Sequence, residues 1–533
     1  MMYASMHAIA STRILCLLLA SSAAIFAADV RLVDAAKNND ARTVRTLISQ
    51  KVDAKLADVD GTTALHWAAQ NGSVEIVDAL LTAGADAKAA NRYGITPMAL
   101  AAENGQTAVI ERLIKTGVDV NTTFGEGQTA LMSAALNGKA DAIRALIKAG
   151  ANVNAVEKFR GQTALMWAAG EGNADAAALL VEFGADVKAK SKGGFTPFLF
   201  TVLNNHIDAM KVLLQHGANV GDTAPDGSTA LNMAIINGHY DLASTLLDLG
   251  ADPKIQDLNG TPLHSLTWMR KPGTSWEAAG TASDPIPVAR PSDKTSSLEL
   301  AKKLLAKGAD PNARITWKET VMTKSLGTTK NPPNVNLGRH HLSFVGSTAY
   351  YNAARNGDVP MMKLLVESGA DPKINTQVGV TPLMAAACLD YYEGESPGPL
   401  TGVSEAERLE AVKLALQLGG DINAKTHFGD YPMIGSAEFT LLTYPENVED
   451  LLGLGVGDPR WDGMTALHGA VICNQPTILQ YLVDQGADLN AKNRLGWTPL
   501  MITKGIFMAN SKKEFPSAAK ILEKALQQKS ASR

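Results

Sequence analysis

Glycines recur along this chain at a spacing of 33 or 34 residues, and this spacing limits the fold more than any other feature. The first series opens segments with threonine close behind, at Gly61, Gly94, Gly127, Gly161, Gly194, Gly227 and Gly260. It resumes at Gly346, Gly379, Gly429, Gly463 and Gly496. A second glycine series, usually opening Gly-Ala-Asp or Gly-Ala-Asn, follows the first by 23 residues in most repeats. Such a period predicts a stack of repeats, each burying its apolar face against its neighbours.

Each repeat predicts two helices and a projecting connection. In residues 94–105 (GITPMALAAENG), Thr96 is a good helix N-cap and Pro97 suits the first helical position. A second helix with an apolar stripe around Leu113 follows an Asn-Gly turn, and Gly117 can take the left-handed conformation that ends a helix. About ten residues then lead to the next helix pair, which is enough for a hairpin-like finger.

Three segments resemble the ankyrin repeat, with its T-P-L-H-x-A core: GTTALHWAAQNG (61–72), GITPMALAAENG (94–105) and GMTALHGAV (463–471). The resemblance covers residues 29–526 and gives about 13 repeats, with an atypical repeat at 29–53 and a degenerate tenth repeat at 429–458. We number the repeats so that Gly61 opens repeat one. Residues 527–533 are expected to form a C-terminal tail.

This resemblance implies an all-α fold, an α-solenoid of stacked helix pairs with β-hairpin fingers. The family usually binds other proteins with the fingers and the inner helices, so we expect a protein partner. His66, His264 and His468 occupy the T-x-L-H or T-P-L-H position, where the family uses the imidazole to brace neighbouring turns. We expect this structural role for all three.

The first 28 residues are expected to be a signal peptide, because Arg13 precedes the apolar and small-residue run ILCLLLASSAAIFAA. We therefore expect an exported protein, periplasmic or secreted. No second apolar stretch approaches the ~20 residues that span a bilayer. Lys plus Arg is 49 against 53 acidic residues, a net charge of −4, and this lack of basic excess argues against a nucleic-acid partner. We expect a monomer.

Three insertions interrupt the register, near 269–295, 313–345 and 389–405. The first and third lie in the turns between the two helices of repeats seven and nine, and the second replaces the finger between repeats seven and eight. They are rich in aromatic residues, which segments without a fold of their own usually lack. One interpretation is a binding region, since insertions in a solenoid often gather on a working surface. The other is that these loops only pack on the solenoid and fill a local defect.

Aromatic and arginine side chains carry most interface energy and define the candidate partner-binding residues. The insertions and their borders supply Trp268, Arg270, Trp276, Arg290, Trp317, Arg339, His340, His341, Tyr391 and Tyr392. The ordinary finger positions supply Arg92, Tyr93, Phe159, Arg160, Phe195, Trp461 and Trp497.

Catalytic motifs are absent from the sequence, so we expect neither an enzyme nor a cofactor. The segment GLGVG (453–457) resembles a phosphate loop but follows an expected helix instead of a strand. His340 and His341 alone lack the three or four ligands of a zinc site. The alternative function is a small-molecule receptor or enzyme with a pocket between the insertions, which a deep polar pocket near Arg339 or His340 would favour.

Two cysteines remain after signal removal, Cys388 in repeat nine and Cys473 in repeat eleven. Helices pack about 8–10 Å apart, so two steps of stacking separate these residues by about 20 Å. A disulfide needs Cα atoms within about 7 Å of each other. The repeat register therefore predicts two free thiols.

Overall fold

The structure is a computed structural model. It describes residues 30–257, 260–270, 293–315, 346–389, 403–427, 461–505 and 514–531, and the backbone of 321–323, 328–331 and 335–336. The chain divides into two compact blocks, residues 1–152 and residues 153–533, and each block is described by itself. The expected signal peptide, residues 1–28, lies outside the described residues.

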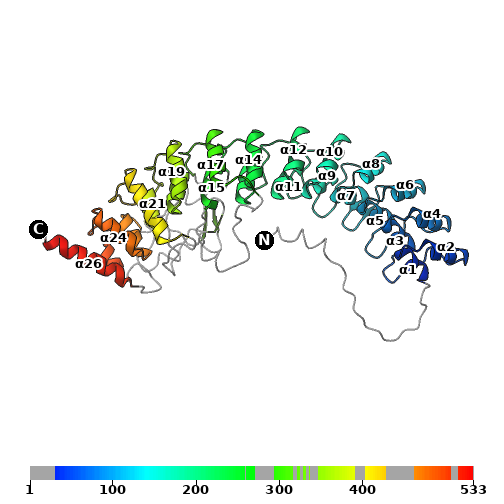
Figure 1. The fold of residues 1–533 in the computed structure, drawn as a ribbon, viewed down its shortest axis with the longest axis horizontal. Helices are drawn as coiled ribbons and strands as arrows, with labels where there is room; N and C mark the ends of the chain where they lie inside the picture. Colours follow the sequence, from blue (N-terminus) through cyan, green and yellow to red (C-terminus); the bar gives the residue numbers. More distant parts are fainter. Residues whose placement is uncertain are drawn as a thin grey trace, which may run out of the picture. The chain divides into compact units, whose positions relative to one another are not determined.

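Within the N-terminal block, the helices form two layers that follow the repeat register (Figure 1). The inner helices are α1 (Arg31–Lys37), α3 (Ala64–Asn71), α5 (Pro97–Glu103) and α7 (Ala130–Leu136). The outer helices are α2 (Ala41–Ser49), α4 (Val74–Thr82), α6 (Thr107–Lys115) and α8 (Ala140–Lys148). Each helix packs on its equivalent in the next repeat, as the period requires. One finger carries an antiparallel pair, β1 (Thr123–Phe124) with β2 (Gln128–Thr129).

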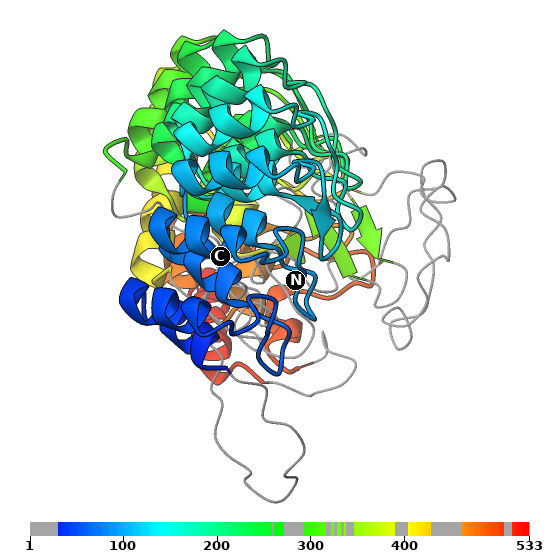
Figure 2. The ribbon, with the colours of Figure 1, turned by 90° about the vertical axis from the view of Figure 1, so that its right-hand side faces the viewer.

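The C-terminal block repeats the same two layers. Its inner helices are α9 (Ala164–Gly170), α11 (Pro197–Leu203), α13 (Ala230–Ile236), α15 (Pro262–Arg270), α18 (Ala349–Arg355), α20 (Pro382–Ala386), α23 (Ala466–Ile472) and α25 (Pro499–Ile502). Its outer helices are α10 (Ala174–Glu182), α12 (Ile207–Gln215), α14 (Tyr240–Asp248), α17 (Ser297–Ala306), α19 (Val359–Glu367), α21 (Glu405–Gln417), α24 (Pro476–Asp484) and α26 (Pro516–Ala531). In both blocks the fingers project from one side of the helix layers (Figure 2).

Helix boundaries follow from the local sequence. The Thr96 hydroxyl accepts a hydrogen bond from the Ala99 amide at 3.2 Å, which caps α5 as expected. Gly117 ends the second helix of that repeat with φ of 81°. Lys51 takes the same left-handed conformation, with φ of 63°, in the atypical repeat at 29–53 that precedes repeat one. At the other end, α26 continues to Ala531, so most of the expected tail is helix.

The three recurring histidines brace neighbouring fingers, as the resemblance implied. The His66 ring bonds its own cap, Thr63, and reaches the Ile95 carbonyl of the next finger at 3.0 Å. His264 and His468 bond their own caps in the same way and reach the next finger at Ser347 and Trp497. Burial lowers the pKa of His264 and of His468 to about 4, because the charged imidazolium would lose its hydration there.

The second insertion leaves the stack at a finger, where it was expected. The Gly346 amide donates to the Ile315 carbonyl at 2.7 Å, and the Ile315 amide donates to Ser347, so the base of the finger is closed. Three short strands lie between these ends: β3 (Val321–Thr323), β4 (Thr328–Asn331) and β5 (Val335–Asn336). They form an antiparallel sheet in chain order, with Met322 opposite Thr329 and Lys330 opposite Asn336. The sequence did not predict this sheet.

Repeats nine and eleven are direct neighbours in the stack. Helix α20 contacts α23, and α21 contacts α24. The Thr426 amide donates to the Met464 carbonyl at 2.9 Å, and the Asp488 amide donates to the Asn423 side chain at 2.8 Å. These are the contacts that consecutive repeats make elsewhere. Residues 428–460, which include the degenerate tenth repeat at 429–458, lie outside the described residues. The expected extra step of stacking between repeats nine and eleven is wrong.

This junction brings the two cysteines together in a disulfide. Cys388 and Cys473 are bonded with their Cα atoms 6.2 Å apart, so the expectation of two free thiols is wrong. Gly469 allows the approach: a Cβ there would lie 2.7 Å from the Leu389 amide nitrogen and 2.9 Å from the Ala387 carbonyl oxygen. Cys388 itself has φ of 77°, a conformation unusual for a residue with a side chain. Both sulfur-bearing residues are fully buried.

Protonation of the buried histidines should make stability depend on pH. Their pKa is lowered in the folded state, so the unfolded state takes up the proton first, and stability falls as pH drops from about 6.5 towards 4. Each histidine should cost about 2 kcal/mol by pH 5. The matched control is His264→Met with His468→Met, since Met132 and Met166 occupy the same helix position in repeats three and four. Urea unfolding at pH 7 and pH 5 should show a smaller loss in the variant; equal losses would contradict this explanation.

Removing the disulfide should destabilise the end of the C-terminal block. The bond closes a loop across a sequence separation of 85 residues, for which chain entropy gives about 4–5 kcal/mol as an upper figure. Cys388→Ser with Cys473→Ser should therefore lower the urea midpoint, measured by circular dichroism. Thiol titration of the denatured, unreduced mature protein should find no free thiol. Two titrating thiols would show that the junction is wrong.

Candidate functional site

Eight of the predicted partner-binding residues lie outside the described residues. They are Trp276, Arg290, Trp317, Arg339, His340, His341, Tyr391 and Tyr392. Their binding role stays a prediction. The structure does describe the helices at both borders of the first insertion, α15 and α17, and with them Trp268 and Arg270.

Trp268 and Arg270 join neighbouring repeats to each other. Trp268 is 1% exposed, and the Arg355 guanidinium of the next repeat lies over its ring, 4.9 Å from the centroid. Arg270 Nε and Nη2 contact the two carboxylate oxygens of Asp358 at 2.6 and 3.1 Å. Asp358 also caps α19, whose Met361 amide donates to it. The surface role expected for Trp268 is therefore wrong. Arg270 is half-buried in this ion pair, which fits the packing interpretation, and its binding role stays a prediction.

The inner-helix face changes along the C-terminal block. The seventh residue after the N-cap threonine is half-buried in repeats five and six, at Leu203 and Ile236. The equivalent residues of repeats seven to nine, Trp268, Arg355 and Cys388, are fully buried. At this one position, the side chains of repeats seven to nine are therefore less accessible than those of repeats five and six.

Two finger tips expose an aromatic ring beside an arginine, one in each block. Tyr93 is 50% exposed, and the Arg92 guanidinium lies 4.9 Å from its ring centroid and donates to its hydroxyl. Phe159 is 67% exposed, and Arg160 lies 5.8 Å from its centroid. An arginine stacked on a ring is held in a defined position without being removed from solvent. These two pairs match the prediction in geometry, and what they bind stays a prediction.

The other three finger aromatics are less available. Phe195 is half-buried and packs on Phe200, with centroids 6.1 Å apart. Trp497 is half-buried, and its carbonyl accepts from His468. Trp461 is 2% exposed, and its carbonyl accepts the Thr426 hydroxyl at the junction of repeats nine and eleven. A partner cannot reach the Trp461 ring, so that expectation is wrong.

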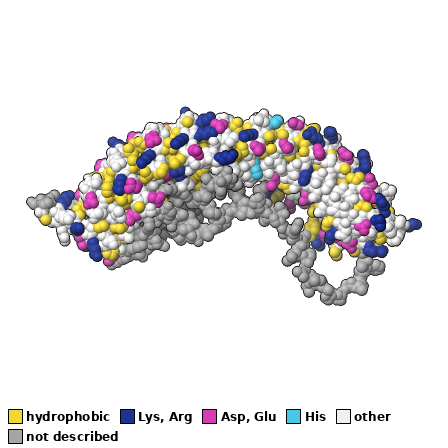
Figure 3. All heavy atoms as spheres, viewed as in Figure 1, with side chains coloured by type: hydrophobic (Ala, Val, Ile, Leu, Met, Phe, Trp, Pro, Cys, Tyr) yellow, Lys and Arg dark blue, Asp and Glu magenta, His cyan; other side chains and the backbone are white. Residues whose placement is uncertain are grey.

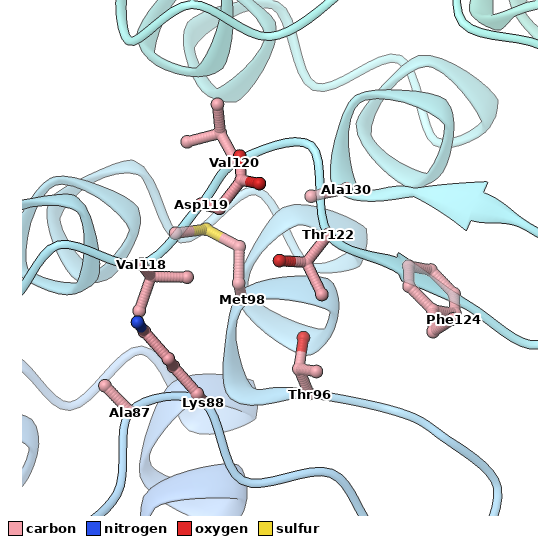
Figure 4. A pocket seen from close by; sticks show the side chains of 10 residues that line it. All are labelled: Ala87, Lys88, Thr96, Met98, Val118, Asp119, Val120, Thr122, Phe124 and Ala130. Carbon is pink, nitrogen blue, oxygen red and sulfur yellow. The ribbon is translucent and has the colours of Figure 1, made fainter.

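A small hollow lies between fingers and inner helices of the N-terminal block (Figure 4). Its volume is about 190 Å³. In the view shown, Met98 lies in the middle with Lys88 on one side and Phe124 on the other, and Asp119 adds a carboxylate. The lining is completed by Ala87, Thr96, Val118, Val120, Thr122 and Ala130. An apolar centre with one cation and one anion at its edge suits a single side chain of a partner.

Basic residues gather on two consecutive fingers, a feature that the sequence analysis missed. Residues 150–163 and 184–196 carry Lys158, Arg160, Lys188, Lys190 and Lys192, against only Glu157 and Asp186. On the face shown in Figure 3, by contrast, basic and acidic side chains are interspersed along the outer helices. Counting charge finger by finger would have revealed this cluster, which the whole-chain charge of −4 conceals.

We also searched the described residues for a metal site and for a membrane-spanning helix. Within those ranges, no group of three or more His, Cys, Asp or Glu side chains is placed to hold a metal ion. Among the same residues, every helix is too short or too polar to cross a bilayer. The finger tips, the half-buried inner face and the small hollow are therefore the candidate binding surfaces.

Breaking the Arg270–Asp358 pair should cost stability without reducing partner binding. Arg270→Met leaves the Asp358 carboxylate, 1% exposed, without its cation, which should cost about 3–5 kcal/mol. Adding Asp358→Asn should recover much of this loss, because the asparagine is neutral and still able to cap α19. Thermal unfolding of both variants measures the effect. A stable Arg270→Met protein that no longer binds its partner would restore the original binding role.

Comparison with known proteins agrees with this geometry. A family model described as ankyrin repeats (3 copies) matches residues 32–124, 121–191, 183–257 and 400–493, and a single ankyrin-repeat model matches 345–377. The chain is 27% identical over 158 residues to transient receptor potential cation channel subfamily A member 1 of Drosophila melanogaster, covering 28% of this chain and 12% of that protein. It is 32% identical over 159 residues to neurogenic locus notch homolog protein 1 of Danio rerio, covering 30% of this chain and 6% of that protein.

Among solved structures, the human ASB11 ankyrin repeat domain aligns with 24% identity and a TM-score of 0.39, over 42% of this chain and 98% of that one. Of the two curated relatives named above, the channel and the notch homolog, the matched region spans about an eighth of the length or less. The family models, by contrast, match more than half of this chain. The chain belongs to the ankyrin-repeat family.

Proposed function

We propose that the mature protein is a non-enzymatic scaffold that binds another protein outside the cytoplasm. The exposed aromatic–arginine pairs at the finger tips, Arg92 with Tyr93 and Phe159 with Arg160, are the observation that carries this proposal. Exposed rings of this kind contribute little to the fold, whereas aromatic and arginine side chains dominate protein interfaces. Ankyrin repeats generally mediate protein–protein interaction, and this agrees with the surface described here.

Export is supported by two independent features. The N-terminal sequence has the anatomy of a signal peptide, with Arg13 before an apolar run. The Cys388–Cys473 disulfide fits an oxidising compartment, because cytosolic thiols are usually kept reduced. We propose a periplasmic or secreted protein.

The small hollow of the N-terminal block is too small for a drug-sized ligand and suits one side chain of a protein partner. Its volume of about 190 Å³ is below the roughly 300–1,000 Å³ of drug-sized ligand sites. One side chain of a bound segment fits such a space, with its backbone lying along the fingers. The eight insertion residues outside the described ranges are proposed as a second contact region, because aromatics, arginines and histidines gather there.

The test begins with identification of the partner. The mature chain, residues 29–533, serves as bait in the exported fraction of its source cells, and mass spectrometry identifies the protein that it retains. Tyr93→Ser and Phe159→Ser are then measured against this partner by calorimetry. Each should weaken binding roughly 10- to 100-fold, the usual cost of losing an interface aromatic.

Leu249→Ser is the matched control. Leu249 is also an exposed apolar residue, at 44%, but it lies at the end of the outer helix α14, away from the finger tips. This variant should bind normally. Full binding by both finger variants, or an equal loss in the control, would refute the proposed surface.

A further inference from the structure

The basic residues of the two fingers are flanked along the sequence by acidic fingers. Residues 117–129 contain Asp119 and Glu126 without any lysine or arginine, and residues 217–229 contain Asp222 and Asp226 in the same way. Between these acidic fingers, the two fingers at 150–163 and 184–196 carry five lysine and arginine side chains against two carboxylates. The whole chain has a net charge of −4, whereas these two fingers are positively charged and should attract acidic groups.

The two carboxylates of these two fingers accept hydrogen bonds from the finger backbone. Glu157 is 5% exposed and accepts hydrogen bonds from the amides of Phe159 at 2.6 Å, Arg160 at 2.7 Å and Gln162 at 2.9 Å. Asp186 accepts from the Lys188 amide at 2.8 Å. These carboxylates shape the turns, while Lys158, Lys188 and Lys190 extend into solvent.

The two tips are also fixed to each other. The Lys192 amide donates to the Arg160 carbonyl at 2.8 Å, and the Lys192 ammonium donates to the Lys158 carbonyl. We name the surface formed by Lys158, Phe159, Arg160, Lys188, Lys190 and Lys192 the basic finger patch. It combines cations with exposed apolar surface, since Phe159 is 67% and the adjacent Val156 is 58% exposed.

We propose that the basic finger patch binds an acidic, extended segment of the partner protein, with an apolar residue of that segment against Phe159. The inference rests on the proposed function and names the chemistry of the partner. Complementary charge speeds and orients association, and the exposed ring supplies a desolvated anchor. Platforms for single-stranded nucleic acid stack successive bases on several rings, whereas this patch has one fully projecting ring. Membrane-surface elements bury a broad apolar face, which two apolar side chains do not provide.

The test uses a fluorescent, disordered peptide in which glutamates alternate with leucine and serine, titrated with the mature protein. Lys158→Glu, Lys188→Glu and Lys190→Glu together should weaken binding roughly tenfold or more, because three attractive charges become repulsive. Phe159→Ser should weaken it by a similar factor. Raising salt from about 0.05 to about 0.5 M should also weaken binding by the unsubstituted protein, because the charges are exposed and screened.

The matched control reverses three other exposed lysines, Lys211, Lys363 and Lys520, which lie on the outer helices α12, α19 and α26. It has the same net charge as the patch variant and should keep the binding of the unsubstituted protein. Circular dichroism checks that both variants are folded. An equal loss in both variants would overturn the inference, because net charge alone would explain it. Binding to vesicles of phosphatidylcholine and phosphatidylglycerol without binding to the peptide would overturn it in favour of a lipid surface.

The captured natural partner separates this inference from the proposed function. If the patch variant retains that partner undiminished while Tyr93→Ser or Phe159→Ser does not, the acidic-segment inference fails and the scaffold function stands. If the mature protein retains no protein at all, the proposed function fails. Loss of both the partner and the acidic peptide in the patch variant, with both kept in the control, supports the inference.

Discussion

Burial between neighbouring repeats is the interaction on which the rest of this structure depends. A single helix pair exposes its apolar stripe, and the small inner-helix residues, such as Ala101 and Ala102, are fully buried only because the next inner helix lies close. The fingers follow the same rule: the Arg92 amide donates to the Asp60 carbonyl, and the Arg494 amide donates to Asp462. The exposed finger-tip side chains, such as Tyr93 and Phe159, take little part in this burial. These are the side chains that we propose for recognition of the partner.

The same constraint explains the junction of repeats nine and eleven. If repeats nine and eleven did not pack on each other, each would leave an apolar inner face uncovered. Direct packing of α20 on α23 removes that cost, and Gly469 permits the close approach. The disulfide then fixes the contact covalently. Elsewhere, the Arg270–Asp358 pair and the stacking of Arg355 on Trp268 join repeats seven and eight across the border of an insertion.

The sequence was sufficient for the local structure, because the signals there are local. Thr96, Gly117 and His66 act as their positions in the repeat predict, and even Lys51 substitutes for a glycine in the expected conformation. The sequence-based predictions were wrong where they depended on which repeats contact each other. Cys388, Cys473 and Trp461 were placed by assuming that every repeat in the sequence takes a place in the stack. Trp268 was taken as exposed because residue type alone cannot distinguish an interface aromatic from a buried one. The basic finger patch was missed because charge was summed over the whole chain.

The central claim is that recognition takes place at the finger tips and that the helices serve to hold them. Hydrogen exchange of the mature protein, with and without its captured partner, tests this claim directly, because a bound partner slows exchange of the amides that it covers. The account predicts slowed exchange in residues 156–160 and 188–195, with unchanged exchange in the outer helices α10, α12 and α14. Slowed exchange confined to the outer helices, with none at the finger tips, would contradict it.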